Sequence, residues 1–191
     1  MAADKGRKRF TPHPAKIVES LTGEERRILE SVLGRPSVAE DVQRAWLHVQ
    51  EERIRLAKSH LAVAELLNGL GTPGLITPEK RSVISRAYYA TFCAARAALS
   101  FHLGSDRNDH QQLPLWLRKA QNLGPEPQRN RVSAALSQLR NTRNQADYSP
   151  FYPEPLGADA RYAVREAKAA IRLCTGWLKQ EARSRGQRST L

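Results

Sequence analysis

The stretch from Ser85 to Leu99, Ser-Arg-Ala-Tyr-Tyr-Ala-Thr-Phe-Cys-Ala-Ala-Arg-Ala-Ala-Leu, decides the fold of this chain. Apolar side chains recur along it at helical spacing, at Ile84, Tyr88, Phe92, Ala95 and Leu99. Six alanines between residues 87 and 98 keep this helix thin, so that a neighbouring helix can approach closely. Because Pro78 suits the first turn of a helix and Gly104 suits its end, we expect a helix from about residue 78 to residue 103.

The remaining sequence is also helical in character. The expected helices cover residues 21–36, 37 to Gly69, 111–121, 127–146 and 158 to beyond 179. The long second helix carries two apolar stripes, one through Val42, Trp46, Val49, Leu56, Val63 and Leu67, the other through Leu47, Ile54 and Leu61. Such a helix contacts neighbours on two sides. We predict an all-α, up-and-down bundle of four to five helices over residues 37–182, with an extra N-terminal helix over residues 21–36.

The two ends of the chain lack this pattern. Residues 1–20 are basic and contain Pro12 and Pro14, so we expect a flexible arm. Residues 183–191 form a basic, polar tail, which we expect to fray. No apolar core follows the basic N-terminus, and no stretch approaches the roughly 18 apolar residues that a membrane span needs. The prediction is a cytoplasmic protein without membrane contact.

Composition narrows the class of partner. The chain has 191 residues, of which 40% are hydrophobic and 26% charged, a balance typical of globular proteins. Its formal net charge of +12 favours polyanionic partners, and RNA or DNA is the commonest of these. The alternative is a solvated basic surface that only maintains solubility. Cys93 and Cys174 are far apart and lack partners at ligand spacing, so we expect neither a metal site nor a cofactor.

One position in the helix over residues 127–146 departs from the apolar pattern. The stripe runs through Val132, Leu136, Leu139, Arg143 and Ala146. An unpaired buried guanidinium is costly, and Asp147 lies one turn beyond Arg143, where the two side chains can meet. A structural ion pair that anchors the helix end to the loop at Tyr148 explains this spacing without a ligand. The functional alternative is a polar site in which Arg140, Asn141 and Arg143 face phosphate, because guanidinium groups donate bidentate hydrogen bonds.

Two segments carry a resemblance to a known family. The stretch from Ser85 to Leu99 resembles the second core helix of HEPN domains, and the segment Arg143-Asn144-Gln145-Ala146-Asp147-Tyr148 resembles the Arg-Asn-x-Ala-Asp-Tyr signature of one branch of that family. His110, which opens the short helix between them, matches a position often filled by histidine. The resemblance covers roughly residues 40–180.

The resemblance implies a helical bundle that usually dimerises. The family includes metal-independent endoribonucleases, many of them toxins or antiviral effectors, and inactive members that bind RNA or protein. Many members are encoded beside a small nucleotidyltransferase. Catalytic members carry an arginine followed, four to six residues later, by a histidine at the end of the fourth core helix.

This sequence departs from the catalytic pattern. No histidine follows Arg140 or Arg143 at that spacing. A neutral imidazole can accept a proton from a ribose hydroxyl near pH 7, whereas a carboxylate held by arginine is a weak base. The same spacing occurs between Arg7 and His13, Arg55 and His60, and Arg96 and His102, but none of these pairs lies on the proper helix. His110 is expected to cap its helix or bond a neighbouring carbonyl; the alternative is a cleft histidine beside Arg143.

The first hypothesis is a non-catalytic module that binds RNA or a partner protein in a dimer cleft. Arg140, Asn141 and Arg143 would contact the anion, Asn144 would position it, and Asp147 with Tyr148 would fix Arg143. Tyr88 and Tyr89 are included as contacts, although tyrosines at such positions more often pack in the core.

Two alternatives stay open. One is a ribonuclease with a variant site, in which Arg143 stabilises the phosphate and Asp147, Tyr148 or His110 transfers the proton. The other is an interaction protein of a toxin–antitoxin or defence pair, whose partner is a nucleotidyltransferase or an antitoxin.

Overall fold

The computed structural model describes residues 19–25, 28, 36–70, 78–152 and 155–191. The chain divides into two units, Met1–Val49 and Gln50–Leu191, and each is described by itself. The described residues form helices and connecting turns, with no strand among them, so the protein is all-α as predicted. No helix in these described ranges combines the length and the apolar character needed to cross a membrane.

In the first unit, Thr22 and Glu25 form the helix start that the sequence predicts there. The backbone N–H of Thr22 donates to Oε2 of Glu25 (2.7 Å), and the backbone N–H of Glu25 donates to Oγ1 of Thr22 (3.2 Å). These reciprocal bonds are a capping box. Residues 1–18 of the expected arm lie outside the described residues. So does most of the expected helix over residues 21–36, including Gly34 near its end.

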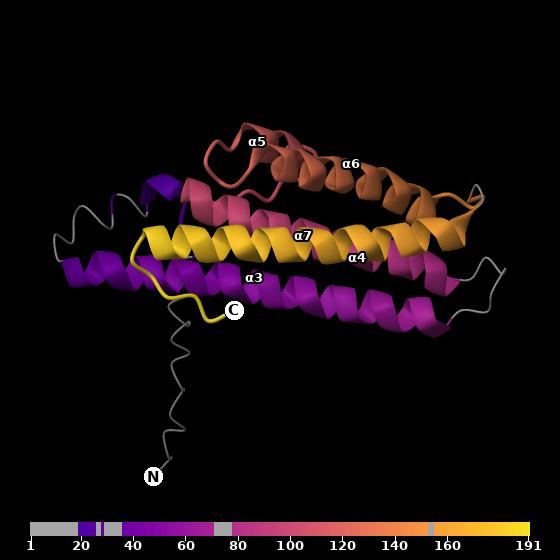
Figure 1. Cartoon of the computed structure of the whole chain (residues 1–191), viewed down its shortest axis with the longest axis horizontal. Coiled ribbons are helices and arrows are strands. Elements are labelled where there is room, and N and C mark those ends of the chain that lie inside the picture. Colours follow the sequence, from indigo (N-terminus) through magenta and orange to yellow (C-terminus); the bar gives the residue numbers. More distant parts are fainter. Residues whose placement is uncertain (1–18, 26–27, 29–35, 71–77, 153–154) are drawn as a thin grey trace, which may run out of the picture. The chain divides into compact units, whose positions relative to one another are not determined.

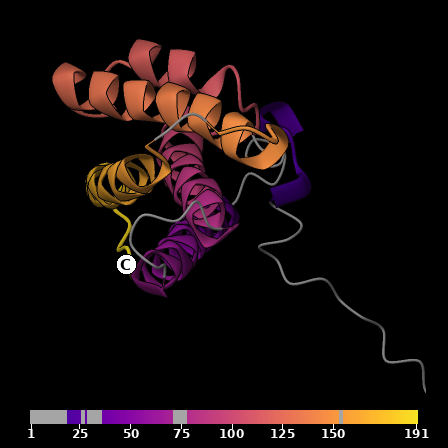
Figure 2. The same ribbon diagram turned by 90° about the vertical axis from the view of Figure 1, so that its right-hand side faces the viewer.

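The second unit is built around helix α4 (Pro78–Leu103). Helices α6 (Glu126–Tyr148) and α7 (Leu156–Ser184) contact α4 extensively, and the short helix α5 (Leu113–Lys119) packs on α6 (Figure 1). In the end-on view of Figure 2, α4 lies beside α7 and beneath α6. Most residues from Ala87 to Phe101 are buried on every side of α4, because the alanines let neighbouring helices approach closely. Gly104 ends α4 with a φ of +67°, a conformation that glycine adopts without strain.

Helix α3 (Pro36–Leu70) begins in the first unit and continues into the second. Its buried face in the second unit contains Ile54, Ala57 and Ala64. Leu56 and Val63, two members of the first predicted apolar stripe, are exposed in the single chain. Small alanines allow closer helix packing than leucine or valine, so the inward face is the one that carries them.

The turn between α6 and α7 is shorter than predicted, because α6 continues to Tyr148. The guanidinium of Arg81 donates from Nη1 to the carbonyl oxygens of Ala146 (2.8 Å) and Ser149 (2.7 Å). Carbonyls of the last helical turn have no partner within the helix, so this arginine satisfies the end of α6.

The basic tail does not fray as expected. α7 continues to Ser184, and residues beyond it fold back on α3. The backbone N–H and the hydroxyl of Thr190 each donate to the Glu51 carboxylate at 2.6 Å, and Arg55 donates to the same hydroxyl at 2.8 Å. These bonds hold the C-terminal tail against α3, although its basic and polar composition suggests that it would be exposed to solvent.

The loop that joins α4 to α5 is fixed by Asp106. Its carboxylate pairs with two arginines, Arg53 of α3 (Nη1 to Oδ1, 3.1 Å) and Arg96 of α4 (Nε to Oδ1, 2.9 Å). It also accepts the hydroxyl of Ser100 (3.2 Å) and the backbone N–H of Arg107 (2.8 Å). Burial alone would raise the pKa of Asp106, but the bonds and charges of Arg96 and Arg53 outweigh it and lower the pKa to about 2.

We expect Asp106→Ala to lower the free energy of unfolding by about 3 kcal/mol, because it removes the carboxylate that pairs with the largely buried guanidinium groups of Arg53 and Arg96. Since the folded-state pKa is depressed, this stabilisation is present above the ordinary aspartate pKa and is lost as pH falls towards 2. Denaturant unfolding of both proteins at neutral and acidic pH measures it. The control is Asp41→Ala, whose ion pair with Arg44 is exposed and should change stability by under about 0.5 kcal/mol. Equal losses in the two variants would contradict a structural role for Asp106.

Candidate functional site

The predicted site residues of α4, α6 and the loop before α5 lie close together. The group comprises Tyr88 and Tyr89 of α4, His110 of the loop, and Arg140, Arg143, Asp147 and Tyr148 of α6, and His60 of α3 joins it. We call these eight residues the α4–α6 cluster. Successive turns of α6 place Arg140, Arg143 and Asp147 along one side of the helix.

Arg143 is held by three neighbours in the α4–α6 cluster. Its Nε lies 2.5 Å from the Asp147 carboxylate, in an i, i+4 ion pair. Its Nη2 donates to the hydroxyls of Tyr89 (3.2 Å) and Tyr148 (3.4 Å). Its guanidinium carbon lies over both rings, 5.5 Å from the centroid of Tyr89 and 5.3 Å from that of Tyr148. These contacts are the structural ion pair that the i, i+4 spacing suggested, extended by two cation–π contacts.

Arg140 differs from Arg143 in its surroundings. Within the part of the chain that the structure describes, no hydrogen bond or ion pair engages its partly exposed guanidinium. Asn141 beside it is exposed, and Asn144 accepts a bond from Nη1 of Arg143 at 3.3 Å. Arg140 is therefore the cation of the cluster that is available to an anion, whereas Arg143 is largely committed to protein groups.

His110 is bonded to a buried tyrosine. The Tyr88 hydroxyl lies 2.6 Å from Nδ1 of His110, and the imidazole stacks on Phe92 with ring centroids 3.8 Å apart. Tyr88 is only 2% exposed, and burial raises its pKa to about 12, so its hydroxyl keeps its proton and needs an acceptor. We therefore assign Nδ1 as the acceptor and Nε2 as the protonated nitrogen of a neutral imidazole.

The local field also keeps His110 neutral. Burial lowers its pKa, and the positive charges of Arg143 and Arg140 lower it further. Asp109, next to it, accepts the backbone N–H groups of Gln111 (2.7 Å) and Gln112 (2.9 Å). Asp109 thus fixes the turn before α5, and the imidazole of His110 does not cap that helix but bonds Tyr88.

His60 is the residue that the sequence analysis set aside. Its ring stacks on that of Tyr89, with centroids 5.8 Å apart. The ring of His110 meets the same tyrosine edge-on, with centroids 6.4 Å apart. Burial and the charge of Arg86 lower the pKa of His60. The sequence offers one indication of this position: His60 follows Arg53 by seven residues, about two helical turns. The two side chains therefore share the side of α3 from which Arg53 reaches Asp106.

The cluster does not offer every predicted residue to a ligand. Tyr88 is buried and holds His110, so its ring has no face for a base, which corrects the expectation that it contacts RNA. Tyr89 is half-buried between His60 and Arg143. Asp147 also accepts the hydroxyl of Ser85 at 3.3 Å, a contact that the sequence analysis did not anticipate.

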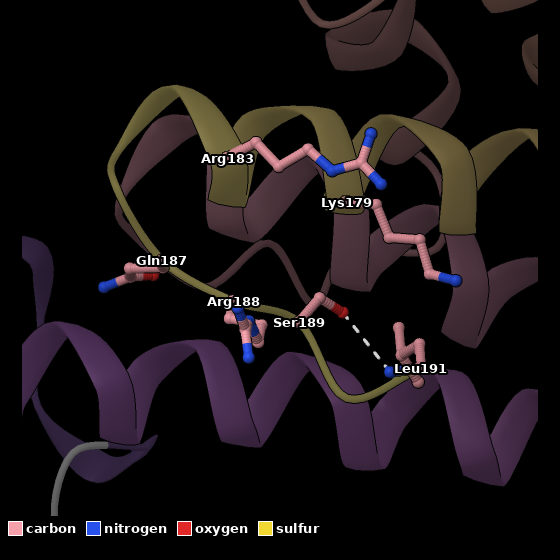
Figure 3. Close-up of a pocket in the computed structure, with 6 residues that line it drawn as sticks. All are labelled: Lys179, Arg183, Gln187, Arg188, Ser189 and Leu191. Atoms are coloured by element: carbon pink, nitrogen blue, oxygen red, sulfur yellow. Dashed lines mark hydrogen bonds between the residues drawn. The ribbon is translucent and has the colours of Figure 1, made fainter.

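The described ranges hold no group of three or more His, Cys, Asp or Glu side chains arranged for a metal ion. A separate hollow lies between the end of α7 and the folded-back tail, lined by Lys179, Arg183, Gln187, Arg188, Ser189 and Leu191 (Figure 3). The hollow lies at the C-terminal end of α7, the end away from the turn between α6 and α7.

The all-α bundle and the cluster on its second and fourth core helices define the class of protein. The family model of the HEPN domain matches residues 50–177, and its first residue coincides with the start of the second unit. Because the match covers more than half of the chain, this chain belongs to the HEPN domain family. Comparison with curated proteins gives no match.

We expect Arg140→Gln to raise the pKa of His110, because one of the positive charges that disfavour imidazolium is removed. NMR titration of the His110 ring measures this shift. The folded-state pKa of His110 is lowered, so its contribution to stability is complete above about pH 6.5 and decreases as pH falls. This acid-side loss should be smaller in the variant. Arg183→Gln removes the same charge at the C-terminal end of α7 and should leave the His110 titration unchanged. An equal pKa shift in that variant would contradict a specific effect of Arg140 on His110.

Proposed function

We propose that this protein is a non-catalytic HEPN module that binds RNA through Arg140 and the groups around it. HEPN domains are typically RNA-binding or ribonuclease-like modules of toxin–antitoxin or defence systems. The observation that carries the proposal is the uncommitted guanidinium of Arg140 beside the oriented guanidinium of Arg143. An RNA phosphate placed there would meet Arg140 directly, with the Nε2–H of His110 as a neutral donor.

Charge supports RNA as the ligand. The cluster contains two arginines and one paired carboxylate, Asp147, so its local charge is positive. The formal net charge of +12 gives the whole chain the same sign. Such a field increases the rate of encounter with a polyanion and makes binding sensitive to salt. A cytoplasmic location, where RNA is abundant, is part of the same proposal.

The tautomer of His110 is the reason we favour binding over cleavage. A general base needs an unprotonated nitrogen that faces the substrate, and in His110 that nitrogen already accepts the Tyr88 hydroxyl. The second candidate function, a variant ribonuclease, rests on His60. Among the described residues its ring nitrogens have no hydrogen-bond partner, and its lowered pKa keeps it neutral at pH 7.

A homodimer is the second part of the proposal. The outward face of α3 carries exposed apolar side chains at positions 56, 63, 66 and 70, which are Leu56, Val63, Leu66 and Leu70. Their spacing of seven, three and four residues is that of a helix–helix seam. An exposed apolar stripe of this kind favours an interface, and a second copy of α3 offers the matching surface.

A nucleotidyltransferase or an antitoxin is the further partner that we propose, and the gene beside this one is the first place to look for it.

We expect the purified protein to leave total RNA intact without metal and to bind a short single-stranded RNA in a salt-sensitive manner. Arg140→Gln should weaken binding and reduce the logarithmic salt slope by about 0.7, the loss of one phosphate contact. Fluorescence anisotropy at several salt concentrations measures this, with Arg183→Gln as the control of equal charge. RNA cleavage that His60→Ala or His110→Ala abolishes would identify a ribonuclease instead, and equal weakening by both charge variants would leave only non-specific attraction.

We expect Leu66→Glu to convert a dimer of the wild-type protein into a folded monomer. The side chain is exposed in the single chain, so the new carboxylate costs little there, but it would be buried at a seam with a second copy. Light scattering after size exclusion gives the mass, and circular dichroism confirms the fold. The control is Leu115→Glu, an exposed leucine on α5. A monomeric wild-type protein, or an unaffected mass in Leu66→Glu, would refute the α3 interface.

A further inference from the structure

Two aromatic rings stand in solvent beside the α4–α6 cluster. Tyr148 is 73% exposed and Phe151 is 87% exposed, and they are the exposed aromatic residues within the part of the chain that the structure describes. Aromatic side chains bury large apolar areas in most proteins. A phenylalanine held in water therefore points to a surface that is covered in some functional state.

The turn that carries both rings is fixed. Arg81 donates to the carbonyl oxygens of Ala146 (2.8 Å) and Ser149 (2.7 Å), and the Ser149 hydroxyl donates to the carbonyl of Phe151 at 2.5 Å. The next residue, Tyr152, is buried and donates its hydroxyl to Asp159 at 2.7 Å. The backbone on both sides of Phe151 is thus anchored. Rings presented in this way lose little conformational freedom when they bind a partner.

Tyr148 lies next to a cation of the cluster, and Phe151 follows Tyr148 by three residues. The Arg143 guanidinium carbon is 5.3 Å from the Tyr148 ring centroid, and Arg140 lies three residues before Arg143 on α6. Each nucleotide joins a negative phosphate to a flat aromatic base. A cationic strip beside exposed aromatic rings is the arrangement by which proteins bind single strands, because each base can stack while the backbone meets the cations.

We propose that Tyr148 and Phe151 form a stacking platform for unpaired bases, and that the protein selects single-stranded over double-stranded RNA. This inference rests on the proposed function, since Arg140 is taken to hold a phosphate and Arg143 to add a fixed positive charge beside it. In a duplex the faces of the bases are covered by their neighbours, so only splayed or unpaired nucleotides can stack on the two rings. Stacking shows little preference among bases, so the selectivity is for strand state and not for sequence.

The test compares a short oligouridylate, a duplex of the same length, and an abasic strand that keeps every phosphate but lacks the bases. By anisotropy, the wild-type protein should bind the oligouridylate at least about ten-fold more tightly than the abasic strand or the duplex. Phe151→Leu, which removes the ring but keeps an apolar side chain, should weaken oligouridylate binding about ten-fold and lower abasic binding by much less. Tyr148→Leu should act similarly, and Tyr148→Phe, which keeps the ring, should not.

The outcomes separate this inference from the proposed function. Equal affinity of the wild-type protein for the oligouridylate and the abasic strand would overturn the stacking platform and leave phosphate binding by Arg140 intact. Equal weakening of both ligands by Phe151→Leu would overturn it too, because the ring would then act through the fold. A change of mass in Phe151→Leu, with RNA binding unaltered, would assign the two rings to a protein interface. Absence of binding to any RNA would refute both proposals.

Discussion

The close packing around α4 is the constraint on which the second unit depends. Alanines at most core positions let α6 and α7 approach α4 closely, and Ile54, Ala57 and Ala64 form the corresponding buried face of α3. Alanine lets the helices approach, and larger side chains such as Phe92 and Leu99 fill the space that remains. Tyr88 and Tyr89 of α4 lie where α6 carries Arg143 and where the loop before α5 supplies His110. The polar cluster therefore forms where two tyrosines interrupt the alanines of α4.

Within that cluster, the two arginines of α6 have separate tasks. Arg143 has Asp147 and two tyrosine rings as partners, and such a partly buried ion pair stabilises the end of α6 only as long as all its members remain. Arg140, one turn earlier, faces the same side without such partners. An anion therefore gains most from Arg140, while Arg143 contributes a fixed charge and holds Tyr148 in place. The division explains how one motif can serve both the fold and a ligand.

The sequence allowed most of the bundle to be predicted, and parts of the site. The spacing of Pro78 and Gly104 defined α4, and the i, i+4 relation of Arg143 and Asp147 anticipated their ion pair. The two apolar stripes predicted for α3 included the buried Ile54 but not the buried Ala57, because a pattern of large apolar residues does not register alanine. His60 and the anchored Phe151 were missed for a different reason. Their roles depend on contacts between segments far apart in the chain, which no local spacing records.

The pairing of His110 with Tyr88 links the core to the chemistry that the site can perform. Protonation of Nδ1 would force the Tyr88 hydroxyl to accept a bond, and its own hydrogen would then need another buried acceptor. The cost of that rearrangement adds to the burial and the arginine charges that already lower the pKa of His110. The imidazole is thereby kept as a neutral donor, suited to holding a phosphate oxygen and poorly suited to removing a proton. In the function proposed above, a core tyrosine that ligands cannot reach is thus the group that favours binding over proton transfer at His110.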